Sequence, residues 1–64
     1  MKTGRVKFFS VEKGYGFITI DSGEGDVFVP ISEVKDKIKE RDRVSFEIVE
    51  EKREKKAINV TRID

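Results

Sequence analysis

The sequence predicts an all-β fold, a closed or nearly closed barrel of five short strands. Short segments rich in β-branched and aromatic residues recur along the 64-residue chain, and the clearest of them place apolar residues at every second position, which is the period of a strand. Segments dense in glycine, aspartate, serine or charged residues separate them. Closure is expected because it removes open sheet edges, which promote aggregation. A chain of this length forms one domain at most, so residues 1–64 are expected to form a single domain.

Three of the strands are expected in the first half of the chain, at residues 5–9, 15–20 and 27–29. Turns at residues 10–14 and 21–26 separate them. The second strand has the clearest alternation, because Ile18 and Ile20 share one face and aromatic residues occupy the other. The third strand alternates in the same way and ends at Pro30, which cannot donate a backbone hydrogen bond.

Residues 31–43 are the least regular segment of the chain. Ile31, Val34 and Ile38 have the spacing of one helix face, and Ser32 is the candidate cap. The segment is too short and too charged for a strong helix, so we expect about one helical turn followed by a loop.

The last two strands are expected at residues 44–49 and 57–63. Residues 50–56, which join them, are all charged and are expected to form a solvated hairpin loop. Alternation directs Ser45 and Glu47 outward. The expected core is mainly aliphatic and consists of Val6, Ile18, Ile20, Val27, Val29, Val44, Phe46, Ile48, Ile58 and Val60, with Ile31 and Val34 as a plug.

This core leaves most of the aromatic side chains outside it. Of the six aromatic residues, only Phe46 is expected inside. Three or four of the others are expected to face solvent, out of Phe8, Phe9, Tyr15, Phe17 and Phe28. An exposed apolar area of this size is typical of a binding site. The alternative is that the strand faces are reversed and the rings form the core, but the aliphatic residues of two separate strands agree against it.

Basic residues accompany these rings, although the chain as a whole is nearly neutral. Charged residues make up 42% of the chain, yet the net charge is +1. Residues 1–20 hold four basic residues and one acidic residue, whereas residues 21–33 hold four acidic residues and no basic one. Such dense, balanced charge is typical either of a thermophile or of ordinary solubility. Because nucleobases stack on aromatic rings while Lys7 and Lys13 can meet phosphates, the pattern indicates binding of single-stranded nucleic acid with low sequence specificity.

The composition argues against catalysis. The chain has no histidine and no cysteine, which removes the commonest general base and the usual metal ligands, so no enzyme activity, cofactor or metal is expected. Asp21, Glu24 and Asp26 suggest a cation site, but a hairpin turn is the better interpretation. The N-terminus lacks the apolar core of a signal peptide, and no apolar run approaches the roughly 20 residues of a membrane span. We therefore expect a cytoplasmic protein with no membrane or small-molecule partner.

Several segments resemble those of the cold-shock proteins. Residues 13–18 (KGYGFI) are similar to the first ribonucleoprotein motif of that family, and residues 27–29 to the start of the second. Residues 4–9, 44–49 and 57–60 are also similar to the family, so the resemblance covers nearly the whole chain. It implies a five-stranded antiparallel OB-fold barrel, with at most one short helical turn after the third strand. It also implies binding of single-stranded RNA and DNA and a role as an RNA chaperone or a regulator of transcription or translation.

The resemblance implies a set of nucleic-acid-binding residues, carried over by position. They are Lys7, Phe8, Phe9, Lys13, Tyr15, Phe17, Phe28, Pro30 and Arg53. The family usually has tryptophan where Phe8 stands and His-Phe where Pro30 and Ile31 stand, and its loop before the fourth strand is longer. We therefore expect weaker binding over fewer nucleotides than is usual for the family.

One alternative function stays open, a small β-barrel for protein interaction or structure whose nucleic-acid binding is weakened. A monomer is expected, with a dimer as the alternative. A phosphate-binding role for the charged run also stays open, through Lys52, Arg53, Lys55 and Lys56.

Overall fold

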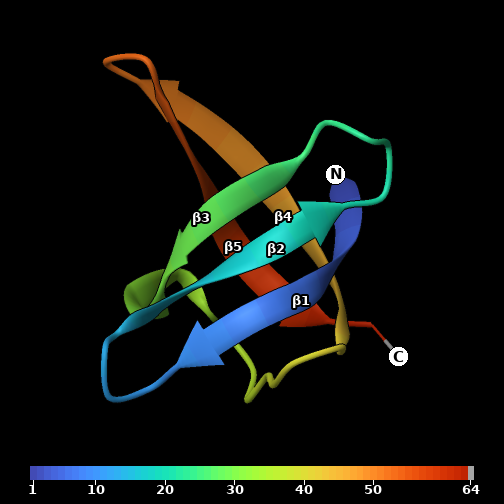
Figure 1. The fold of residues 1–64 in the computed structure, drawn as a ribbon, viewed down its shortest axis with the longest axis vertical. Coiled ribbons are helices and arrows are strands. Elements are labelled where there is room, and N and C mark those ends of the chain that lie inside the picture. Colours follow the sequence, from blue (N-terminus) through green and yellow to red (C-terminus); the bar gives the residue numbers. More distant parts are fainter. Residues whose placement is uncertain (64) are drawn as a thin grey trace.

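The computed structural model describes residues 1–63 and contains five strands and one 3-10 turn (Figure 1). The elements are β1 (Lys2–Ser10), β2 (Tyr15–Ile20), β3 (Asp26–Pro30), η1 (Ile31–Glu33), β4 (Arg43–Glu51) and β5 (Glu54–Arg62). The strands close into a barrel in the order β1-β2-β3-β5-β4. The predicted all-β class, the number of strands and the single short helical turn are confirmed. Within residues 1–63 there is no helix long and apolar enough to cross a membrane.

The barrel is mixed rather than wholly antiparallel, which corrects one part of the expectation. Four of its seams are antiparallel, but β3 and β5 run parallel and pair at Phe28 and Lys56. The reason is parity: strand directions cannot alternate all the way around a ring with an odd number of members. One parallel seam is therefore required, and it lies beside Phe28.

A bulge in β1 decides which of its aromatic side chains faces inward. Val6 pairs with Ile18, but Phe8 pairs with Phe17, so Lys7 is an extra residue in β1. The bulge interrupts the alternation of faces. As a result Phe9 packs against the core together with the buried Val6, while Phe8 lies on the outer surface.

A second bulge, in β5, overturns one predicted core position. The pairing of β4 with β5 shifts register, and Asn59 in β5 has a φ of +52°, in the left-handed region. The shift lets Ala57 and Val60 both point inward, and both are fully buried. Ile58 was expected in the core, but it is only half-buried and does not belong to the core cluster.

The observed core keeps the predicted aliphatic character. Its buried members are Val6, Ile18, Ile20, Val27, Val29, Ile38, Val44, Phe46, Ala57 and Val60, with Phe9, Val34 and Ile48 packed against them. Ser45 is also buried, although alternation directs it outward; its hydroxyl shares a 2.9 Å hydrogen bond with that of Thr61, which satisfies the polar group.

The segment after β3 keeps only part of its predicted role as a plug, because Val34 packs against the core but Ile31 does not. Ile31 is 39% exposed, whereas Ile38 is buried. Ile38, which lies farther along the chain from β3, therefore closes the barrel in place of Ile31. Ser32 lies inside the 3-10 turn and does not cap it; Pro30 is the N-cap residue. The helix-like spacing was misleading because a three-residue turn is too short to align side chains seven positions apart.

The hairpin between β4 and β5 also differs from prediction. Residues 50–56 were expected to form a loop, but both strands continue through this charged run and leave only Lys52 and Arg53 as the turn. Their φ angles are +48° and +72°, as in a type I′ turn, whose twist matches that of the two strands. The result is a ribbon that extends away from the barrel (Figure 1).

Gly16 permits the close approach of β2 to β1. A Cβ atom at this position would collide with the backbone oxygen of Phe8 and would lie 2.6 Å from ring atom Cδ1 of Phe9. We predict that Gly16→Ala lowers the free energy of unfolding by about 1–3 kcal/mol, because the backbone of β1 must shift. Urea denaturation measures the change. Val11→Ala is the control, since Val11 is 71% exposed and lies outside the strands; an equal effect of the two substitutions would refute the packing argument.

Candidate functional site

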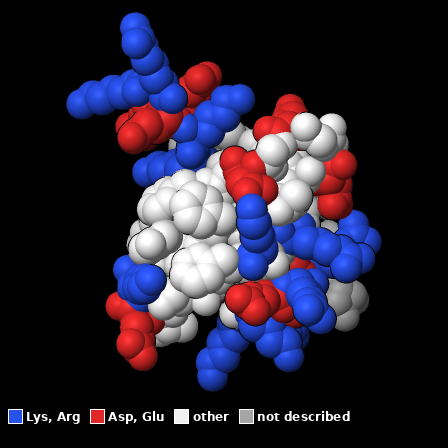
Figure 2. All heavy atoms as spheres, in the orientation of Figure 1, with Lys and Arg blue, Asp and Glu red and all other residues white. Residues whose placement is uncertain are grey.

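Four aromatic rings lie together on the outer surface of β1, β2 and β3. This aromatic platform consists of Phe8, Tyr15, Phe17 and Phe28. The ring of Tyr15 is central, with centroids 6.1 Å from Phe8, 6.0 Å from Phe17 and 5.6 Å from Phe28. Phe17 and Phe28 remain 36% and 38% exposed. Figure 2 shows an uncharged area with ring side chains on this face, bordered by acidic and basic side chains.

The platform follows directly from strand pairing. Phe17 lies opposite Phe28 across β2 and β3, and the bulge in β1 brings Phe8 opposite Phe17. The neighbouring positions Ile18 and Val27 point the other way and are buried. The prediction that these rings face outward is therefore confirmed, and the alternative with reversed strand faces is wrong.

Lys13 stands at one end of the platform. Its Nζ atom lies 5.8 Å from the centroid of Phe8, within the range of a cation–π contact. The preceding turn is closed by a 2.8 Å hydrogen bond from the amide of Gly14 to the carbonyl oxygen of Ser10, and Gly14 has a φ of +81°. That left-handed conformation favours glycine. The turn thus holds a positive charge beside the half-buried ring of Phe8.

Pro30 and Ile31 continue the surface beyond Tyr15. Pro30 lies opposite Tyr15 in the pairing of β2 with β3. The amide of Ile31 donates a 2.9 Å hydrogen bond to the carbonyl oxygen of Gly14, which ties the end of β3 to the β1–β2 turn. Pro30 is half-buried and Ile31 is exposed. This edge of the site therefore offers aliphatic contact area instead of further rings.

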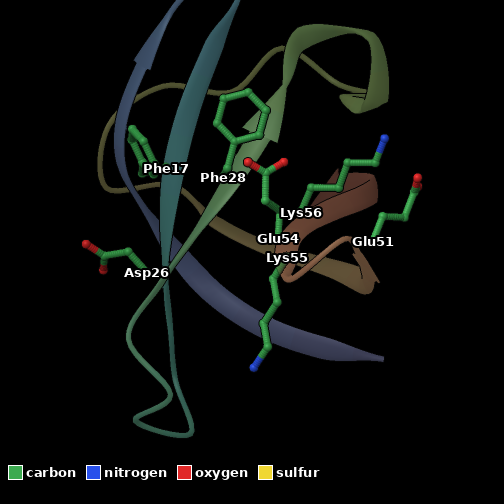
Figure 3. A pocket seen from close by; sticks show the side chains of 7 residues that line it. All are labelled: Phe17, Asp26, Phe28, Glu51, Glu54, Lys55 and Lys56. Carbon is green, nitrogen blue, oxygen red and sulfur yellow. The ribbon is translucent and has the colours of Figure 1, made fainter.

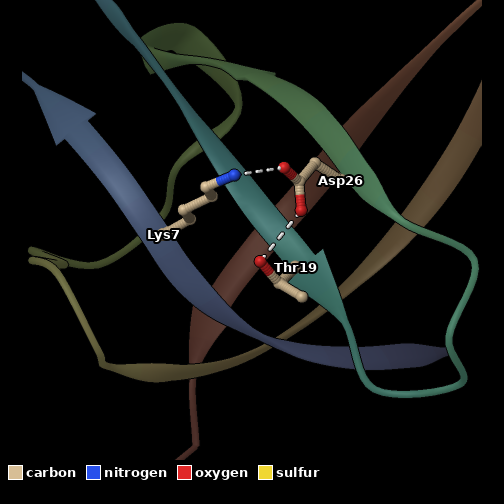
Figure 4. A network of polar contacts seen from close by, with 3 residues as sticks. All are labelled: Lys7, Thr19 and Asp26. Atoms are coloured by element: carbon tan, nitrogen blue, oxygen red, sulfur yellow. Dashed lines mark hydrogen bonds and ion pairs between the residues drawn. The ribbon is translucent and has the colours of Figure 1, made fainter.

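Lys7, on the bulge of β1, is already engaged within the protein. Its Nζ atom donates a 2.9 Å hydrogen bond to Oδ2 of Asp26, and the hydroxyl of Thr19 donates another of 2.9 Å to Oδ1 (Figure 4). These two hydrogen bonds, that of Lys7 first, hold the pKa of Asp26 below its ordinary value of 3.8. Asp26 is therefore ionised at neutral pH. The stability that the pair contributes is complete well above pH 3.8 and is lost as the pH falls through the lower pKa of the folded state.

The other acidic residues of the β2–β3 loop have separate partners. Asp21 accepts hydrogen bonds from the hydroxyl of Thr3 at 2.9 Å and from Arg43 at 3.2 Å. Glu24 forms an ion pair of 3.1 Å with Lys2. Each of these loop carboxylates therefore pairs with a different basic side chain, Arg43 of β4 or Lys2 of β1. They do not converge on a common cation site.

An open hollow of about 600 Å³ lies beside the platform. Its lining residues come from β2, β3, β4 and β5 and are Phe17, Asp26, Phe28, Glu51, Glu54, Lys55 and Lys56 (Figure 3). The parallel pairing of Phe28 with Lys56 brings the start of β5 here. Sequence reasoning did not place Glu51 or Glu54 at the platform, because only this seam between distant strands puts them there.

The predicted site residues are not all brought together. Phe9 packs against the core and lines a different hollow, with Val11 and Ile38. Arg53 lies in the turn of the β4–β5 hairpin and does not line the hollow beside the platform. The remaining predicted residues lie on or next to the platform, namely Lys7, Phe8, Lys13, Tyr15, Phe17, Phe28 and Pro30.

Comparisons with known structures agree with the fold. A chain described as drosophila Unr CSD456 superposes with a TM-score of 0.83 over 98% of this chain, at 20% sequence identity. The present chain spans 26% of that longer chain, and the likeness concerns the fold alone.

Sequence comparisons identify the family. Residues 2–63 match the family described as the 'Cold-shock' DNA-binding domain. The chain is similar to the cold shock-like protein CspD of Bacillus cereus, with 47% identity over 97% of this chain and 98% of that protein. It is also similar to the cold shock protein CspA of Staphylococcus saprophyticus, with 43% identity over 98% of this chain and 100% of that protein. The chain therefore belongs to the cold-shock domain family.

Proposed function

We propose that this protein binds single-stranded RNA and DNA without catalysis and with low sequence specificity. Bases stack on the aromatic platform, and lysines beside it contact the phosphates. The observation that carries the proposal is the platform itself: four rings grouped around Tyr15 on one surface, two of them more than one-third exposed. Unpaired bases offer flat faces to such rings, whereas a duplex hides them.

Stacking must supply most of the binding energy. The net charge is +1, and Lys7 is held by Asp26, so the attraction for a polyanion is modest. Each base stacked on an aromatic ring contributes about 1–3 kcal/mol, whereas an exposed ion pair contributes about 0–1 kcal/mol. Three stacked bases therefore outweigh the phosphate contacts available to this surface.

The cellular role that follows is that of an RNA chaperone in the cytoplasm, or of a regulator of transcription or translation acting through the same contacts. A protein that binds unpaired strands and not duplexes shifts transcripts toward the unpaired state by mass action. We propose that residues 1–64 act as a single domain and as a monomer. The aliphatic edge at Pro30 and Ile31 shortens the row of rings, so fewer nucleotides are covered than by relatives with rings at these positions.

Removing a ring from the platform tests the proposal. Phe17→Ala or Phe28→Ala should weaken oligonucleotide binding by more than about tenfold, because one stacked base is lost. Binding is followed by quenching of the emission of Tyr15, since the chain has no tryptophan, and the fold is checked by circular dichroism. Ile63→Ala is the matched control, because Ile63 is as exposed as Phe28 but lies beyond β5. Unfolding of either ring variant at room temperature would show that the ring supports the core.

The salt dependence of binding measures the share of phosphate contacts. For a single strand, the logarithm of the binding constant falls with the logarithm of the salt concentration with a slope of about −0.7 per neutralised phosphate. We expect a slope no steeper than about −2, which corresponds to at most about three phosphates. Titration of oligo-U and oligo-dT at several salt concentrations gives the slope. Absence of binding at low salt would reject the proposal and favour a protein-interaction barrel.

Because Lys7 is paired with Asp26, we expect removal of this carboxylate to strengthen the binding of nucleic acid. Asp26→Asn should lower the Kd for oligo-U by up to about fivefold at low salt, because the carboxylate of a weak surface ion pair no longer competes with phosphate for Lys7. Asp21→Asn changes the net charge equally but frees Arg43 instead of Lys7, so it should have the smaller effect. Weaker binding by Asp26→Asn would mean that the carboxylate itself contacts the ligand.

A further inference from the structure

The hollow beside the platform combines exposed rings with a carboxylate wall. Phe17 and Phe28 form one side, with centroids 5.9 Å apart and planes inclined at 71°. The start of β5 forms the other side. Figure 3 shows the carboxylate of Glu54 directed toward the ring of Phe28, while the amino groups of Lys55 and Lys56 extend away from it in different directions. A base that stacks here therefore meets a hydrogen-bond acceptor at its edge.

The carboxylate of Glu54 is available to such a base. Asp26 also lines the hollow, but both of its oxygens already accept hydrogen bonds, from Lys7 and Thr19. Among residues 1–63, no ion pair or side-chain hydrogen bond engages Glu54, and its side chain is exposed. Lys55, the next residue in β5, forms no ion pair with it, and Figure 3 shows its amino group extending away from the carboxylate of Glu54.

The stability of the β4–β5 hairpin does not explain why a glutamate stands at position 54. Glu51 and Glu54 lie directly opposite each other at the end of the β4–β5 ribbon, next to the turn. Like charges in facing positions destabilise a strand pair, and the turn between them holds two non-glycine residues at positive φ. Departures from local stability of this kind are typical of functional positions.

We infer that Glu54 makes this hollow a subsite that prefers guanine; the inference rests on the proposed function of the platform. The Watson–Crick edge of guanine presents two adjacent donors, N1–H and the N2 amino group, which match the two oxygens of one carboxylate. Uracil and thymine present a single donor between two carbonyl oxygens. The carboxylate repels these two oxygens. Adenine and cytosine present one amino group next to a ring-nitrogen acceptor, so each makes a single hydrogen bond to the carboxylate. Their affinity for the subsite therefore lies between that of guanine and that of uracil or thymine.

The platform binds bases with low sequence specificity at every position except this hollow. The other rings of the platform, Phe8 and Tyr15, are neighbours of Lys13 and Pro30 and do not line the hollow. Bases on that part of the surface stack without an acceptor from β5 at their edge. A single guanine in a pyrimidine strand should therefore be enough to show the preference.

The test compares three short oligonucleotides by fluorescence anisotropy with the full chain: all uridine, the same strand with one central guanosine, and the same strand with inosine there. Inosine keeps the purine ring and N1–H but lacks the amino group, so it separates hydrogen bonding from stacking area. We expect the guanosine strand to bind at least about fivefold more tightly than the all-uridine strand, as for a bidentate base contact. Inosine should lose most of that gain.

Two substitutions assign the effect to one carboxylate. Glu54→Gln should abolish the ratio between the guanosine and inosine strands, whereas Glu51→Gln, which removes the same charge from the same hollow, should preserve it. Equal affinity of the unmodified protein for all three strands would overturn the inference and leave the proposed function standing, and so would a ratio that survives Glu54→Gln. Failure to bind any strand would overturn both.

Discussion

The opposed placement of aliphatic and aromatic side chains on β2 and β3 is the constraint on which the rest of this structure depends. Ile18 and Val29 have no exposed surface, and the pleat of a strand then forces Phe17 and Phe28 outward. A slip of one residue in the pairing would bury the rings and expose the aliphatic residues. The same strand pairing that closes the core therefore builds the platform.

Charge plays a subordinate part because the protein neutralises itself locally. The basic N-terminal strand lies beside the acidic β2–β3 loop, and three ion pairs of 2.9–3.2 Å join Lys2, Lys7 and Arg43 to that loop and to Asp26 at the start of β3. All three pairs are well exposed, so each contributes little to stability. The Lys7–Asp26 pair reduces the positive charge beside the rings, so the rings must provide most of the affinity.

The charged hairpin makes the two ends of the site chemically different. The parallel seam between β3 and β5 sets Lys56 beside Phe28 and turns one side of the platform into a hollow with acidic and basic walls. The opposite side, at Pro30 and Ile31, is aliphatic and open. A single-stranded nucleic acid lying across the platform thus meets an aliphatic surface at one end and hydrogen-bonding groups at the other.

The sequence by itself determined the number and approximate positions of the strands, most of the aliphatic core and the outward rings, because alternation with period two is a local property that neighbouring residues display. It also carried the resemblance to the cold-shock family. Only the tertiary structure decided the inward turn of Phe9, the exclusion of Ile58 from the core, and the contact of Lys7 with Asp26. The first two depend on bulges, which break the alternation without a local signal. The contact of Lys7 with Asp26 joins residues of β1 and β3 across β2. The place of Glu54 beside Phe28 depends on the seam between β3 and β5, which comes only with barrel closure.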